Sequence, residues 1–112
     1  MMKLVTIILN KTECLDNLLE TFRDNNLPGA TIIDSKGMIQ ELNDSNDVRI
    51  VGSLRGLFTP EHNENKTILM VAREEDFKVI SRILNEATGG LSKPDTGIMF
   101  TLPIDYLEGM AH

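Results

Sequence analysis

The sequence is poor in the residues that build most catalytic and metal centres. It has one cysteine, two histidines and no tryptophan among 112 residues, and 4% of the chain is aromatic. A single cysteine excludes an internal disulfide, which fits a reducing compartment, so we expect a cytoplasmic protein. Two histidines give no Ser/His/Asp or Cys/His constellation, and we therefore expect no enzymatic activity.

Positive charge and long apolar runs are also scarce. Eleven Lys and Arg face seventeen Asp and Glu, for a net charge of −6, which argues against nucleic-acid binding. No apolar run approaches the roughly 18–20 residues that span a bilayer, so we expect no membrane insertion. The run at residues 4–9 is much too short for a signal peptide's apolar core and cleavage site.

The residues that are present are typical of one folded domain. The chain is 41% hydrophobic and 25% charged, close to the globular average, and its length predicts a single domain over residues 1–112. Short β-branched runs predict four strands, at residues 4–9, 30–35, 66–72 and 98–102. Apolar residues at helical spacing predict helices at residues 13–25 and 77–87, and one helical turn is expected within residues 105–110.

This order predicts an α+β fold of the ferredoxin-like βαββαβ type, with two helices on one face of an antiparallel sheet. Asn10 or Thr12 is a candidate cap for the first helix, and Glu13 lies three residues after Asn10, as a capping box requires. The strands are apolar on both alternating faces, although a sheet covered on one side should alternate apolar and polar residues. We therefore expect a second subunit to cover the other face, which makes the protein a homo-oligomer.

A long loop with little periodicity is predicted over residues 38–65, and loops of this length are usually functional. Arg49 and Arg55 are interleaved with apolar residues and are candidate ligand contacts, or solvated arginines of a short edge strand. Three apolar residues of the loop are candidates for binding a partner protein: Leu54, Leu57 and Phe58.

Two further features of this region have a simpler interpretation. Glu41, Asp44 and Asp47 lack the spacing of an EF-hand calcium loop, so a solvated polar loop is favoured. His62 has no second histidine nearby to suggest a metal pair, and no metal site is expected. Cys14 lies in the first helical turn, where a small, partly buried residue is favoured over a reactive thiol.

A glycine-rich loop joins the second helix to the last strand. Its backbone N–H groups and a lysine can form an anion site, or the loop is a left-handed helix cap followed by an ordinary turn. The candidate ligand contacts are Gly89, Gly90, Lys93, Thr96 and Gly97.

Several short segments resemble nitrogen regulatory P-II proteins and their P-II-like relatives. They are Ser35-Lys36-Gly37, Met70-Val71, Lys78-Val79-Ile80, Thr88-Gly89, the run from Asp95 to Phe100, and Leu102-Pro103-Ile104. The resemblance implies a signalling trimer that binds an adenine nucleotide (ATP, ADP, AMP or a cyclic nucleotide) between subunits. It further implies that the 38–65 loop, the T-loop of the family, docks on a transporter or enzyme, with Gly37 at its base.

The chain departs from the family pattern in three ways. Ile98 stands where the family has a lysine that meets phosphate, no arginine follows Arg82, and residues 38–65 contain no tyrosine. These departures favour a diverged P-II-like sensor of a small anionic metabolite. The alternatives are a ligand-independent interaction module and a metal-binding trimer resembling the divalent-cation tolerance proteins.

Overall fold

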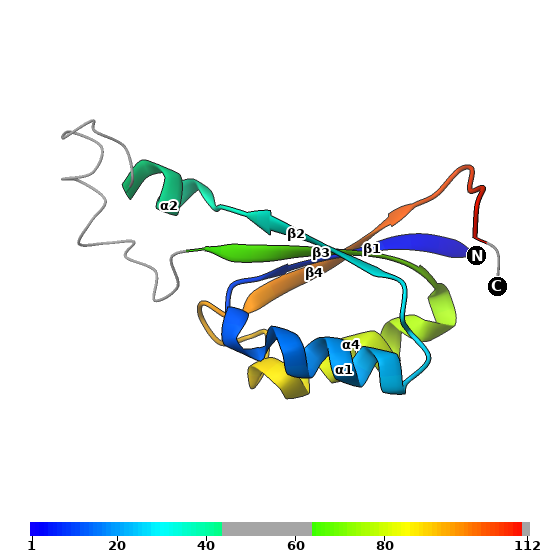
Figure 1. Cartoon of the computed structure of the whole chain (residues 1–112), viewed down its shortest axis with the longest axis horizontal. Helices are drawn as coiled ribbons and strands as arrows, with labels where there is room; N and C mark the ends of the chain where they lie inside the picture. The colour runs from blue at the N-terminus through cyan, green and yellow to red at the C-terminus, as the bar shows by residue number, and fades with distance from the viewer. Residues whose placement is uncertain (44–63, 111–112) are drawn as a thin grey trace.

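The computed structural model describes residues 1–43 and 64–110. The described residues form a four-stranded antiparallel sheet with two helices packed against one face (Figure 1). This arrangement confirms the predicted ferredoxin-like α+β class.

The elements follow the order that the hydrophobic pattern predicts, with one addition between the second and third strands. In chain order they are β1 (Met2–Leu9), the 3₁₀ turn η1 (Thr12–Cys14), α1 (Leu15–Asp24), β2 (Ala30–Ser35), α2 (Met38–Asn43), β3 (Asn65–Arg73), the 3₁₀ turn η2 (Glu74–Asp76), α4 (Phe77–Thr88) and β4 (Gly97–Pro103). The addition is α2, where we expected loop. Residues 44–63, most of the predicted 38–65 loop, lie outside the described part of the chain.

The sheet has the strand order β2-β3-β1-β4, and each neighbouring pair is antiparallel. The strand β1 is therefore central and pairs with β3 on one side and β4 on the other. The register aligns Ile7 with both Ile68 and Met99, which places these three side chains on the same face of the sheet.

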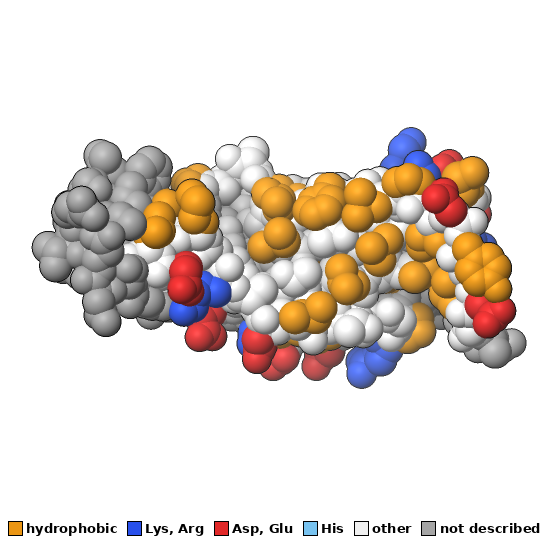
Figure 2. Space-filling view, turned by 90° about the horizontal axis from the view of Figure 1, so that it is seen from above, with side chains coloured by type: hydrophobic (Ala, Val, Ile, Leu, Met, Phe, Trp, Pro, Cys, Tyr) orange, Lys and Arg blue, Asp and Glu red, His pale blue; other side chains and the backbone are white. Residues whose placement is uncertain are grey.

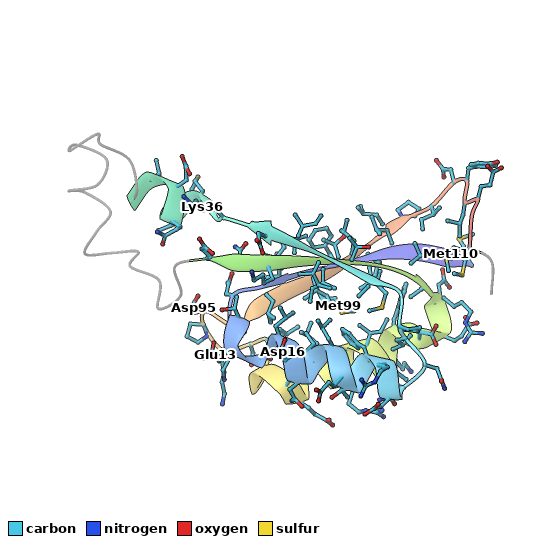
Figure 3. All side chains as sticks on the ribbon, viewed as in Figure 1. Glu13, Asp16, Lys36, Asp95, Met99 and Met110 are labelled. Carbon is cyan, nitrogen blue, oxygen red and sulfur yellow. The ribbon has the colours of Figure 1, made fainter. Side chains whose placement is uncertain are left out.

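The covered face of the sheet, which packs against α1 and α4, holds the core. Val5, Ile7 and Leu9 of β1 have no solvent-exposed surface, and Figure 3 shows Met99 between the sheet and the helices. Residues of β3, α1 and α4 complete the core: Ile68, Met70, Ala72, Leu18, Phe22, Ile80, Ile83 and Leu84. Burial of this continuous apolar layer is the main stabilising contribution to the fold.

The opposite face of the sheet has no covering element within the described chain. We call it the open face and define it by Leu4, Ile8, Ile33, Leu69, Val71, Ile98, Phe100 and Leu102. The β4 residues among them are 55%, 41% and 46% exposed at Ile98, Phe100 and Leu102, and Figure 2 shows apolar side chains gathered over this face. Both faces are thus apolar, as the strand pattern predicts.

Two local predictions were wrong. The predicted cap residues do not take the N-cap position: Lys11 is the N-cap of η1 and Cys14 that of α1, and neither makes a side-chain cap. The Asn10 backbone N–H donates to Thr96 O at 3.0 Å, and a 3₁₀ turn begins the helix. The tail after β4 forms no helical turn over the described residues 105–110, where Gly109 has a φ of 98°.

Candidate functional site

A cleft of about 530 Å³ lies where the connection from β1 to α1 meets the loop from α4 to β4. Figure 3 shows Glu13 and Asp95 together at this end of the molecule. The residues that line the cleft are Lys11, Glu13, Thr88, Gly89, Lys93, Pro94, Asp95 and Thr96.

One wall of the cleft begins where α4 ends. Gly89 adopts the left-handed conformation, with φ 87° and ψ 3°, and its N–H donates to Asn85 O at 3.0 Å. The predicted left-handed cap is thereby confirmed, and glycine suits the position because it has no Cβ to clash there. The Asn85 side chain accepts a further hydrogen bond from the Leu91 N–H at 2.8 Å, which holds the start of the loop against the helix.

The loop closes on Thr96, which is 5% exposed. Its Oγ1 donates to Lys93 O at 2.9 Å, and its carbonyl accepts the N–H groups of Asn10 and Lys11 at 3.0 and 3.1 Å. These bonds tie the two walls of the cleft together. A Cβ on the next residue, Gly97, would lie 2.7 Å from Ile8 O, so this close approach requires glycine.

Lys11 also lines the cleft, although no sequence pattern predicted it. Its Nζ donates to Thr88 O at 3.2 Å and lies 4.0 Å from the position that a Cβ on Gly89 would take. A cation beside the last carbonyls of a helix is favourable, because those groups carry partial negative charge. Lys11 and Thr88 are 77 positions apart in sequence, and no local signal links them.

The cleft has a balanced set of charges. Lys11 and Lys93 supply two ammonium groups, Glu13 and Asp95 supply two carboxylates, and the C-terminal end of α4 adds partial negative charge at Thr88. A ligand here can meet both hydrogen-bond donors and acceptors on charged side chains.

Cys14 lies behind this wall and belongs to the core. Its Sγ donates to Lys11 O at 2.9 Å. Burial raises the pKa of the thiol above its ordinary value of 9.0, and the nearby Lys11 ammonium acts in the opposite direction. This agrees with the interpretation as a small packing residue, since the reactive form of cysteine is the thiolate.

The structure brings together part of the predicted ligand set. Gly89, Lys93 and Thr96 line the cleft, and Gly90 and Gly97 are their chain neighbours. Gly37 is not among the lining residues; it precedes α2, where its carbonyl accepts the Glu41 N–H at 3.0 Å. The remaining predicted residues lie outside the described chain: Arg49, Leu54, Arg55, Leu57 and Phe58, with Asp44, Asp47 and His62.

Ile98, where the P-II resemblance leads one to expect a lysine, is not a cleft residue. It pairs with Ile8 in the β1–β4 register and belongs to the open face. The register of the strand thus places this side chain on the exposed apolar surface.

A second cavity, of about 350 Å³, lies at the other end of the sheet. Its lining is largely apolar and includes Met2, Leu27, Met70 and Met110, with Arg73 and Asp76 at an ion-pair distance of 3.3 Å. Within residues 1–43 and 64–110, His, Cys, Asp and Glu form no group of three or more that could hold a metal ion. No helix in those same ranges is long and apolar enough to cross a membrane.

Comparisons with known proteins show the fold alone. No protein-family profile matches the sequence, and no curated protein matches it. Among solved structures, the chain is similar to a functionally unknown protein from Pediococcus pentosaceus ATCC 25745. The two share 18% sequence identity and a TM-score of 0.64, over 97% of each chain.

Proposed function

We propose that this chain is a P-II-like regulatory protein, cytoplasmic and without enzymatic activity. It senses a small anionic metabolite at clefts between subunits, with an adenine nucleotide as the first candidate, and regulates a protein partner through the 38–65 loop. This is the function that the family resemblance implies, and it requires a ligand site beside a self-associating surface.

The cleft beside Gly89 is the single observation that carries the proposal. Three of the predicted ligand contacts line it, namely Gly89, Lys93 and Thr96, and Lys93 supplies positive charge. Backbone hydrogen bonds at Gly89, Lys93 and Thr96 hold the loop in one conformation. A preorganised loop binds a ligand without a large cost in conformational entropy.

The open face supports the homo-oligomer. Large apolar patches on a soluble chain usually mark interaction sites, and Ile98, Phe100 and Leu102 form a row along β4. A sheet face that is apolar along three adjacent strands fits a second copy of itself. The trimer is the state that the family resemblance favours.

Hydrogen bonds between the end of β2 and the start of β3, where the 38–65 loop leaves and rejoins the sheet, support regulation through that loop. Ser35 Oγ hydrogen-bonds with Thr67 Oγ1 at 2.8 Å and donates to Asn65 O at 3.3 Å. These bonds fix the ends of β2 and β3, between which the loop begins and ends. A ligand can regulate the partner if it binds one state of the loop more tightly than another.

Binding measurements with ATP, ADP, AMP and cyclic AMP test this function. We expect calorimetry to detect binding of at least one of them, with a rise in melting temperature because the ligand binds the folded state. Light scattering should give the mass of a trimer. Absence of binding by all four, with the trimer intact, would refute the nucleotide sensor.

The open face also favours a second candidate, a ligand-independent interaction module that docks on a partner protein. A pull-down that depends on Leu54, Leu57 and Phe58 and is unchanged by nucleotide would support it. A pull-down that nucleotide abolishes or strengthens would support the sensor instead.

A further inference from the structure

The segment that follows β4, residues 105–110, turns back toward the N-terminal end of β1 (Figure 1). Within the described chain, no backbone hydrogen bond joins this segment to another element. Tyr106 Oη donates to Glu108 Oε1 at 2.6 Å, but this bond lies inside the segment. Side-chain packing must therefore hold residues 105–110 against the rest of the molecule.

Met110 provides such a packing contact. Gly109 turns the chain with a φ of 98°, and Met110 then lines the cavity of about 350 Å³ together with Leu27, Met70 and Val71. Figure 3 shows Met110 beside the start of β1. The lining is largely apolar, and an unbranched thioether side chain adapts well to an irregular apolar space. Met110 thus fastens the end of the segment to the sheet.

The thioether of Met110 is open to chemical modification. Met110 is 39% exposed, whereas Met70 in the same cavity is 2% exposed. Hydrogen peroxide oxidises a thioether to the sulfoxide: its O–O bond breaks, one oxygen bonds to the sulfur, which loses two electrons, and the other oxygen takes the proton and leaves as water. The sulfoxide is polar, so its burial against an apolar lining is unfavourable.

We infer that residues 105–110 form a strap that Met110 fastens over the cavity, and that oxidation of Met110 to the sulfoxide releases the strap. Release exposes the cavity wall formed by residues 71–73 of β3, which extend past Met70, the last residue of β3 that pairs with β2. The device is a redox-sensitive switch at the opposite end of the sheet from the cleft beside Gly89. It goes beyond the proposed function and does not depend on nucleotide binding.

The test follows the strap by NMR in the full-length protein, before and after treatment with hydrogen peroxide. The ¹H–¹⁵N NOE values of residues 105–110 report the order of the strap, the amide shifts of Gly29 and Val71 report the cavity, and peptide mass spectrometry locates the sulfoxide. We expect oxidation to lower the NOE values to those of a free tail and to shift the cavity amides. Methionine sulfoxide reductases with a thiol reductant should restore both.

Substitutions at three methionines assign the effect. M110L keeps an apolar side chain of similar volume without sulfur, so its strap should stay ordered in peroxide. M110Q is polar without oxidation and should release the strap in the absence of peroxide. M38L is the matched control, because Met38 is 72% exposed and does not line the cavity. M2L removes a second thioether of the cavity lining, and both M38L and M2L should respond to peroxide as the wild type does.

Three results would overturn the inference. The first is a strap that is disordered before oxidation. The second is a strap that stays ordered with Met110 fully oxidised, for example through hydrogen bonds from Asn26 or Arg73 of the lining. The third is an equal loss of order in oxidised M110L, which would assign the release to another methionine. Nucleotides take no part in these measurements, so each result is independent of the proposed sensor.

Discussion

The two faces of the sheet have similar side chains and different surroundings. On the covered face, Val5 and Ile7 of β1 are fully buried beneath α1 and α4, whereas Phe100 and Leu102 on the open face remain substantially exposed. Figure 1 shows both helices on the same side of the sheet. The strand pattern therefore encodes two apolar layers, and the described chain covers only one of them.

The largest expected difference between the faces is in their contribution to the stability of a single chain. Phe22 packs into the covered face and is 1% exposed, whereas Phe100 is 41% exposed. We expect F22A to lower the free energy of unfolding by about 3–5 kcal/mol, because it leaves a cavity in the core. F100A should cost less than about 1 kcal/mol.

Urea denaturation at low protein concentration, where chains are dissociated, measures both values. Equal losses for the two substitutions would contradict the view that the open face is uncovered in the single chain.

The open face should matter most for association between chains. We expect L102D to weaken self-association by about a hundredfold, or about 3 kcal/mol, because a carboxylate would be buried without a partner in the interface. Light scattering over a dilution series measures the change in mass. N17D is the control, since it places a carboxylate on the exposed surface of α1.

A response of N17D equal to that of L102D would show that added charge, and not the open face, controls association. A wild-type protein that stays monomeric at high concentration would refute the homo-oligomer itself.

The close contact between β4 and β1 should show a smaller effect. We expect G97A to destabilise the fold by about 1–3 kcal/mol, because the new Cβ would meet Ile8 O at 2.7 Å and the strands must move apart. A Cβ on Gly29 would meet no atom within 4 Å apart from its chain neighbours, so G29A should be neutral or stabilising by up to about 1 kcal/mol.

Thermal denaturation of the two alanine variants gives their difference in melting temperature directly. If G97A melts at the temperature of G29A or above it, the two strands are less tightly constrained than the structure indicates.

The smallest expected effect is a loss of stability at alkaline pH, caused by ionisation of Cys14 in the core. Burial raises the pKa of this thiol above 9.0, so the folded state keeps a proton that the unfolded chain has already released. Stability is therefore complete below the ordinary pKa and declines as the pH rises through the folded pKa. C14A should remove the part of this decline that comes from the thiol. Urea denaturation at a series of pH values from 8 upward measures the unfolding free energy of both proteins.

The quantity to compare is the slope of the unfolding free energy against pH, since C14A also changes packing and thereby the free energy itself. A wild-type slope no steeper than that of C14A would contradict the raised pKa.

Much of the fold could be predicted because its signals are local. The β-branched run at residues 30–35 coincides with β2, and the spacing of Leu15, Leu18 and Phe22 predicts α1. The glycine pair after residue 88 predicts the end of α4, and Gly89 has the expected left-handed conformation. The short helix α2 was missed because six residues give too little periodicity to separate a helix from a polar loop.

The candidate site was less predictable because it joins distant segments. Lys93 and Thr96 were found from the composition of one loop, whereas Lys11 reaches the cleft only because β1 and β4 are neighbours in the sheet. Gly37 was grouped with the same site from the resemblance, but it does not line the cleft.

Local patterns were enough to predict the element types, the left-handed cap at Gly89 and the two apolar sheet faces, since each depends on residues within one segment. Three features required the folded chain: the face that the helices cover, the position of Ile98, and the contact between Lys11 and Thr88 at the cleft. These features depend on strand register and helix packing, which are set by contacts between residues far apart in the chain.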